Sequence, residues 1–85
     1  MTVQLAQHNG RIYLRAPFNE DLIDDLKFRF PLRRRGWDPD RRLWWVDERE
    51  ADSLLTLLAW HQADVRHVPF DAIAVNNRKI SGVKP

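Results

Sequence analysis

The sequence predicts a small α+β domain in the order ββα-ββα, with an antiparallel sheet and two helices packed on one face. Three observations support this prediction. The dipeptide Asn9-Gly10, typical of tight hairpins, separates two segments that alternate polar and apolar residues. A second turn, Asp38-Pro39-Asp40-Arg41, has the residues of a type I turn. Each pair of predicted strands precedes apolar residues at helical spacing, with an Asn or Asp where the helix begins.

The first ββα unit extends to Pro31. Thr2 to Gln7 and Arg11 to Arg15 alternate as strands, joined by the Asn9-Gly10 turn. Asn19 then caps a helix whose first residues are acidic, which suits the positive end of the helix dipole. Pro31 ends this helix, because proline lacks the N–H that a helix interior requires. The apolar positions of the helix are Leu22, Ile23, Leu26 and Phe30.

The second unit repeats this order. Its strands are predicted at about Arg33 to Trp37 and Arg42 to Val46. Asp47 caps the second helix, and Glu50 three residues later completes an aspartate version of the capping box. Val65 to Val68 is a candidate short edge strand. The predicted apolar stripe of the second helix consists of Ala51, Leu54, Leu55 and Leu58.

With 85 residues, the chain has room for one core, so we expect a single domain over residues 1–75 and a flexible basic tail over residues 76–85. The absence of cysteine excludes disulfides and thiolate metal sites. The amino-terminal residues do not have the pattern of a signal peptide, and the apolar stretches are too short to cross a bilayer. These features predict a soluble cytoplasmic protein without a membrane partner.

Charge is distributed unevenly along the chain. The formal net charge is only +2, yet the segment from Arg29 to Arg42 carries six arginines against two aspartates. The first helix is mainly acidic, with Glu20, Asp21, Asp24 and Asp25. A capped, solvated helix face explains these carboxylates better than a metal or acid–base site. We find no nucleophile triad, phosphate-binding loop or dinucleotide motif, so the sequence predicts a protein that is not an enzyme and has no cofactor.

Nucleic-acid binding is the leading hypothesis, because residues 33–45 contain five arginines and three tryptophans. Guanidinium groups neutralise phosphates, and indole rings stack on bases. An alternative is that the arginines form a solvated strand edge and pair with nearby carboxylates. Lys27 and Arg29 have a further alternative, complementing the carboxyl end of the first helix. The candidate nucleic-acid-binding residues are Arg33, Arg34, Arg35, Arg41, Arg42, Trp45, Lys27 and Arg29.

Strand alternation assigns the tryptophans to two faces of the sheet. If the turn pairs Trp37 with Arg42, then Trp37 and Trp44 share one face and Trp45 lies on the other. We expect Trp37 and Trp44 to face the helices as core and Trp45 to be the ring that stacks on bases. Alternatively, Trp45 packs against the carboxy-terminal segment or forms an oligomer interface. A one-residue slip, or a bulge at Gly36, would exchange the two faces.

Two segments, Tyr13 to Lys27 and Trp37 to Trp44, resemble the HARP domain, a module that accompanies annealing helicases. In that family a strand leads into a Leu-Ile helix ending in lysine, and an aromatic-Asp turn leads to a basic residue and a strand tryptophan. The resemblance covers about Arg11 to Leu58, and one departure is Trp45, where the family pattern has a small or polar residue. The matching residues are Leu22, Ile23, Lys27, Trp37, Asp38, Arg42 and Trp44.

The resemblance implies a DNA-binding accessory that recognises DNA structure, such as a junction between single-stranded and duplex DNA, rather than sequence. Any ATP-driven step would come from a partner helicase. A competing hypothesis is a protein-interaction module, for example a phage or bacterial factor that docks on polymerase or replication machinery, since arginine and tryptophan also dominate protein interfaces. A third is a homodimer that uses Trp45.

Overall fold

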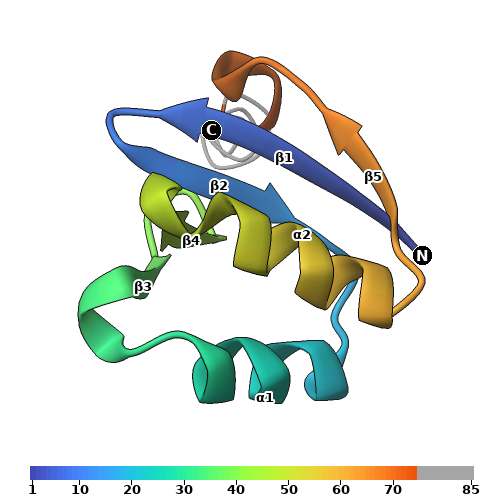
Figure 1. Cartoon of the computed structure of the whole chain (residues 1–85). Coiled ribbons are helices and arrows are strands. Elements are labelled where there is room, and N and C mark those ends of the chain that lie inside the picture. The colour runs from blue at the N-terminus through green and yellow to red at the C-terminus, as the bar shows by residue number, and fades with distance from the viewer. Residues whose placement is uncertain (75–85) are drawn as a thin grey trace.

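The computed structural model, which describes residues 1–74, is built around one five-stranded sheet in the order β3-β4-β2-β1-β5 (Figure 1). The strands are β1 (Thr2–His8), β2 (Arg11–Arg15), β3 (Arg35–Asp38), β4 (Leu43–Asp47) and β5 (Asp64–His67). The α-helices are α1 (Glu20–Arg29) and α2 (Ala51–Trp60), and short 3-10 helices are η1 (Leu32–Arg34) and η2 (Glu48–Glu50). The predicted α+β fold is confirmed. The predicted tail over residues 76–85 lies outside the described residues.

The first hairpin forms as predicted. Asn9 and Gly10 both have positive φ, 49° and 79°, the backbone that a tight two-residue turn requires. Leu5 pairs with Leu14, so the apolar residues of both strands point to the same side of the sheet. β5 adds one parallel pairing to β1 at the edge, which makes an otherwise antiparallel sheet mixed. The candidate edge strand over Val65 to Val68 is thus present, displaced by one residue.

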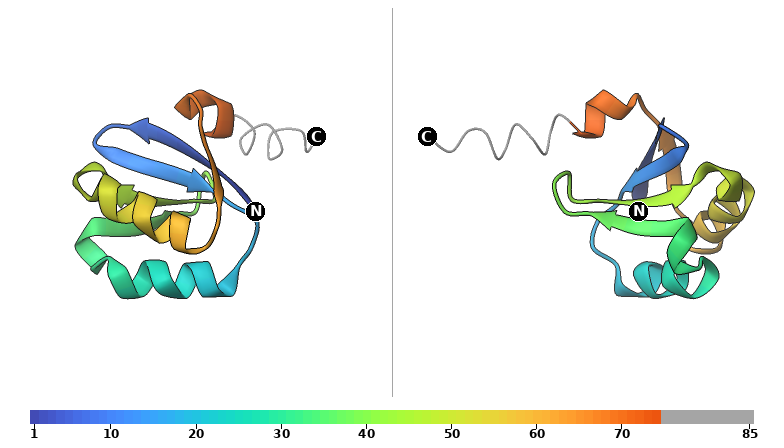
Figure 2. Two further views of the ribbon diagram at one scale, coloured as in Figure 1. Left: turned by 45° about the vertical axis from the view of Figure 1, so that its right-hand side comes forward. Right: turned by 90° about the vertical axis from the view of Figure 1, so that its left-hand side faces the viewer.

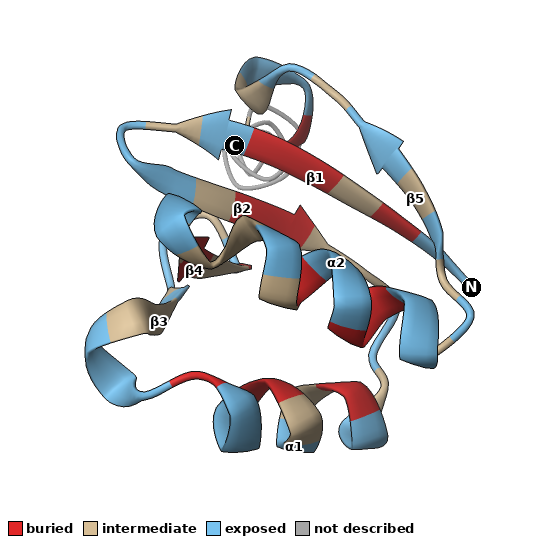
Figure 3. Cartoon of the chain, in the orientation of Figure 1, coloured by how far each residue is buried: buried red, intermediate tan, exposed pale blue. Residues whose placement is uncertain are grey.

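Both α-helices cover one face of the sheet, as predicted (Figures 1 and 2). Asn19 caps α1, and its side-chain oxygen accepts a hydrogen bond of 3.1 Å from the N–H of Leu22. The helices turn their buried sides toward the sheet (Figure 3). This main core consists of Val3, Leu5, Leu14, Leu22, Leu26, Phe30, Val46, Leu54, Leu57 and Leu58.

Two predicted details of α2 are wrong. Asp47 caps η2 rather than α2, and Glu50 does not return to Asp47 but accepts a hydrogen bond from Arg34 at 2.9 Å. The helix also presents Leu57 to the core in place of Leu55, which is 40% exposed. The first turn expected for the helix is instead the 3-10 helix η2, so α2 begins only at Ala51.

The opposite face of the sheet has a smaller apolar cluster. A helical turn at residues 70–74 packs there, on the side of the sheet away from α1 (Figure 2). Phe70 stacks on His8 with 3.9 Å between ring centroids, and Arg15 donates a hydrogen bond of 2.7 Å to the carbonyl of Ile73. Within residues 1–74, no helix is long and apolar enough to span a membrane.

Candidate nucleic-acid interface

The turn of the β3–β4 hairpin, which holds the arginines and tryptophans, lies one residue later in the sequence than predicted. Trp37 pairs with Trp44 and Asp38 pairs with Leu43, so the predicted pairing of Trp37 with Arg42 is wrong. The loop has four residues, closed by a hydrogen bond of 2.7 Å from the N–H of Arg42 to the carbonyl of Asp38. Because the pairing moved by two residues, the assignment of side chains to faces is unchanged.

The turn depends on the Asp38 side chain. Its carboxylate accepts hydrogen bonds from the backbone N–H groups of Asp40 and Arg41, at 3.0 and 3.2 Å, and from the Arg41 guanidinium at 2.8 Å. Partial burial raises the pKa of Asp38, but the hydrogen bonds from Arg41 outweigh it and hold that pKa below its ordinary value. Arg42 completes the turn in the left-handed region, with φ of 59°.

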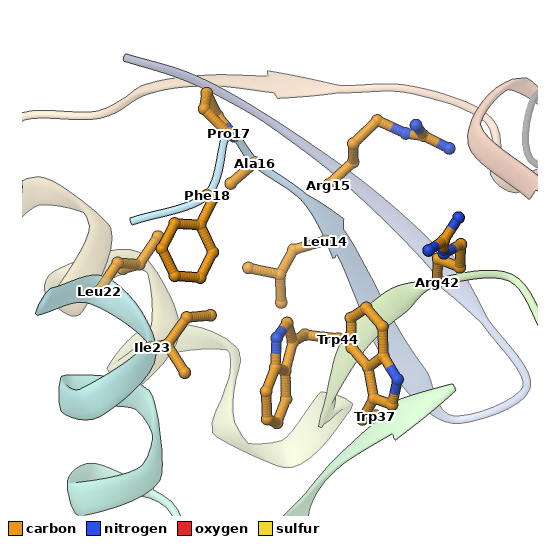
Figure 4. A pocket seen from close by; sticks show the side chains of 10 residues that line it. All are labelled: Leu14, Arg15, Ala16, Pro17, Phe18, Leu22, Ile23, Trp37, Arg42 and Trp44. Atoms are coloured by element: carbon orange, nitrogen blue, oxygen red, sulfur yellow. The ribbon is translucent and has the colours of Figure 1, made fainter. Parts of the chain in front are cut away.

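A pocket of about 680 Å³ lies on the helix-covered face, between α1 and the β3–β4 hairpin (Figure 4). Aromatic and aliphatic side chains make most of its wall. Trp37 and Trp44 stand side by side in it, with ring centroids 5.5 Å apart and planes inclined by 58°. The lining residues are Leu14, Arg15, Ala16, Pro17, Phe18, Leu22, Ile23, Trp37, Arg42 and Trp44.

Trp37 is a surface residue, although the sequence predicted it as core. It lies on the helix-facing side of the sheet as expected, but β3 is an edge strand with no further strand beyond it in residues 1–74. The side chain is therefore 48% exposed, while Trp44 on the neighbouring strand is half-buried against the main core. Phe18, which the sequence analysis did not single out, is 90% exposed at the pocket margin. One indication in the sequence of where Phe18 lies is that it directly precedes the cap residue Asn19, so it stands where the chain enters α1.

Trp45, the predicted stacking residue, lies on the opposite face and is half-buried. Its indole packs over Gly36, and the guanidinium carbon of Arg11 lies 3.8 Å from the ring centroid. It also packs against the small cluster that includes Ile73, which matches the alternative of packing against the carboxy-terminal segment. The ring therefore already has a stacking partner within the chain.

The candidate arginines fall into two groups. Three are held by contacts within the chain, and η1 takes Arg33 and Arg34 out of the predicted strand. Arg34 pairs with Glu50 at 2.9 Å, Arg41 pairs with Asp38 at 2.8 Å, and Arg35 donates a hydrogen bond of 2.8 Å to the carbonyl of Phe30. For these three, the alternative of local pairing describes the structure.

Arg29, Arg33 and Arg42 form the second group. All three are exposed, and none has an ion pair or side-chain hydrogen bond within residues 1–74. Arg42 borders the pocket. Lys27 is also exposed, and its Nζ lies 5.9 Å from the ring centroid of Trp44. Two exposed cations, Arg42 at the pocket and Lys27 beside Trp44, are thus close to the pocket tryptophans.

Comparison with known proteins identifies no relative of this chain. The chain matches no family model, and searches of curated proteins and of solved structures find no similar protein. The resemblance to the HARP domain therefore stays a prediction from the sequence.

Proposed function

We propose that this chain is a non-enzymatic nucleic-acid-binding module that binds DNA where bases are unpaired, as at a junction between single-stranded and duplex DNA. The observation that carries the proposal is the half-exposed ring of Trp37, set beside Trp44 in a pocket that Arg42 borders. An indole stacks on a base of any identity, and a guanidinium neutralises the adjoining phosphate. The stacking role thereby moves from Trp45 to Trp37.

The phosphate contacts are assigned to the unpaired cations. Arg29, Arg33 and Arg42 need not break an ion pair within the described chain before they contact a phosphate. Arg34 and Arg41 would first have to leave Glu50 and Asp38. Electrostatic attraction by Arg29, Arg33 and Arg42 therefore supplies most of the affinity in this proposal.

Recognition of DNA structure is supported by the resemblance to the HARP domain. Five of the seven residues that carry the resemblance line the pocket, and Lys27, a sixth, lies close to Trp44. In this proposal a partner helicase supplies any ATP-driven step, and the nucleic acid is located in the cytoplasm. The five residues of the resemblance that line the pocket are Leu22, Ile23, Trp37, Arg42 and Trp44.

The test is a titration of fluorescently labelled single-stranded, duplex and forked DNA, read by anisotropy at about 50 and about 200 mM salt. Three phosphate contacts to a single strand give a log–log salt slope of about −2, so the affinity should fall about 20-fold between these concentrations. Forked and single-stranded DNA should bind more tightly than duplex. An affinity that does not change with salt would exclude the phosphate contacts.

Arg42→Asn removes the pocket cation, and asparagine tolerates the left-handed backbone at this position. The variant should lower the magnitude of the salt slope by about 0.7, the value of one phosphate contact on a single strand. Arg66→Asn on β5 is the matched control, because it removes an exposed arginine on the opposite edge of the sheet. Equal effects of the two substitutions would indicate non-specific attraction to net charge.

A second candidate function, a protein-interaction module, has an observation of its own. Phe28, Leu32 and Trp60 are 92%, 77% and 73% exposed and do not line the pocket. Large exposed apolar residues are frequent at protein interfaces. A polymerase or another replication protein would be the partner. A stoichiometric complex that survives nuclease and high salt, and that Phe28→Ala disrupts, would support this function.

A further inference from the structure

The pocket beside α1 is apolar on one side and cationic on the other. Figure 4 shows Phe18, Leu22 and Ile23 toward α1, with Arg42 on the far side of the two tryptophans. Arg15 also lines the pocket, but its guanidinium donates a hydrogen bond to the carbonyl of Ile73. No carboxylate is among the lining residues. The complementary ligand has a flat apolar part joined to an anion.

We infer that this pocket holds one unpaired nucleotide, with its base against Trp37 and its phosphate on Arg42, and that it distinguishes neither base identity nor DNA from RNA. This inference rests on the proposed function and specifies its ligand. The volume of about 680 Å³ is in the usual range for pockets that bury a small molecule, roughly 300–1,000 Å³. A base inside a duplex has both faces covered by its neighbours, so an unpaired base is the one expected to stack on Trp37.

Tolerance of any base follows from the hydrogen-bonding groups of the lining side chains. These are the guanidinium of Arg42 and two indole N–H groups, because the guanidinium of Arg15 is bound to the carbonyl of Ile73, and all of them are donors. Reading a base edge requires donors and acceptors in a complementary pattern, because adenine and cytosine present amino groups as well as ring nitrogens. The lining offers those amino groups no side-chain acceptor, so in this inference stacking decides the affinity.

Tolerance of the sugar follows from the same lining. A protein distinguishes RNA from DNA through contacts with the 2′-hydroxyl, which acts as both donor and acceptor. Ribose hydroxyls are often held by a carboxylate, as in dinucleotide sites, and no carboxylate lines this pocket. The inference thus extends the DNA expected from the sequence to single-stranded RNA.

The test uses the full chain and short, length-matched oligomers of dA, dC, dT and riboA, with an abasic oligomer that retains only sugar and phosphate. The base-bearing oligomers should bind within about tenfold of one another, because stacking does not depend on a particular edge pattern. The abasic oligomer should bind about 5- to 150-fold more weakly, the range for loss of one base–aromatic stack.

Three tryptophan variants separate the pocket from the rest of the surface. Trp37→Ala should weaken the base-bearing oligomers by that same factor and leave the abasic oligomer unchanged, whereas Trp37→Phe should retain most of the affinity. Trp60→Ala is the matched control, because this tryptophan is 73% exposed on α2 and lies outside the pocket lining. Circular dichroism of each variant verifies the fold.

The contrary outcomes are distinct. Equal binding of abasic and base-bearing oligomers would overturn the pocket inference while leaving a backbone-binding function in place. Failure of every oligomer to bind at low salt would overturn the proposed function itself. A preference above about 30-fold for one base, or for one sugar, would refute the tolerance argued from the donors-only lining. A dimer in light scattering that Trp37→Ala converts to monomer would assign the pocket to a second copy of the chain.

Discussion

The indole of Trp45 lies directly over Gly36, its cross-strand partner on β3. A Cβ atom added to this glycine would lie 2.5 Å from three atoms of the ring. The hairpin can therefore carry a tryptophan on this face only because the opposing residue has no side chain. The contact, together with Arg11 on the ring, gives Trp45 a structural role and leaves Trp37 as the exposed indole of the hairpin.

Gly36→Ala should therefore destabilise the protein. The added methyl group forces the ring from its position, and overpacking of this kind costs about 1–3 kcal/mol in unfolding free energy. Urea denaturation measures the loss, and near-ultraviolet circular dichroism reports the displaced indole. In a Trp45→Val background the same substitution should cost much less, because the clashing ring is absent. Equal costs in both backgrounds would show that the ring contact does not restrict this position.

Substitution of Arg35 and Arg33 should separate stability from binding. Arg35→Ala removes a charged donor to the carbonyl of Phe30 and should cost about 1.5–3 kcal/mol of unfolding free energy. Arg33→Ala removes an exposed side chain without a partner in residues 1–74, so stability should change by less than about 0.5 kcal/mol while DNA affinity falls. Chemical denaturation and anisotropy measure the two effects. The reverse pattern would contradict the division of the arginines.

Acidic pH should remove the contribution that the Asp47 carboxylate makes to the free energy of unfolding. Hydrogen bonds from the Arg49 side chain and N–H lower the pKa of this carboxyl from 3.8 to about 2. The folded state therefore binds fewer protons than the unfolded state between these values, so stability is fully present above pH 3.8 and is lost as pH falls toward about 2. Asp47→Asn retains an oxygen to cap η2 but does not titrate. Its unfolding free energy should vary less over this pH range; an unchanged slope would refute the assignment.

Phe70→Ala should test the turn at residues 70–74 independently of the pocket. The ring stacks on His8 and lies 4.9 Å from Tyr13, so its loss should cost roughly 1–3 kcal/mol, below the range for a fully buried phenylalanine. Binding of single-stranded DNA at a temperature where the variant is folded should be unchanged, because the pocket is on the other face of the sheet. A loss of affinity with intact fold would instead place part of the binding surface on this side.

Local sequence patterns were sufficient for most of the fold. The Asn9-Gly10 turn, the Asn19 cap and the alternation of the strands depend on neighbours within a few residues, and all three are present. One error occurred where a distant residue competes for a group. Glu50 leaves the predicted capping box because Arg34, 16 residues away in sequence, takes its carboxylate.

The sequence by itself determined which face of the sheet each tryptophan occupies, because side chains alternate along a strand whatever surrounds it. Only the tertiary structure decided which ring is available to a ligand. Exposure depends on long-range packing: Arg11, from the first hairpin, covers Trp45, whereas Trp37 lies on an edge strand beside a pocket. The same long-range packing assigned a partner to Arg34, which pairs with Glu50. Alternation along a strand is a local property of the backbone, whereas solvent exposure is set by elements that are remote in sequence.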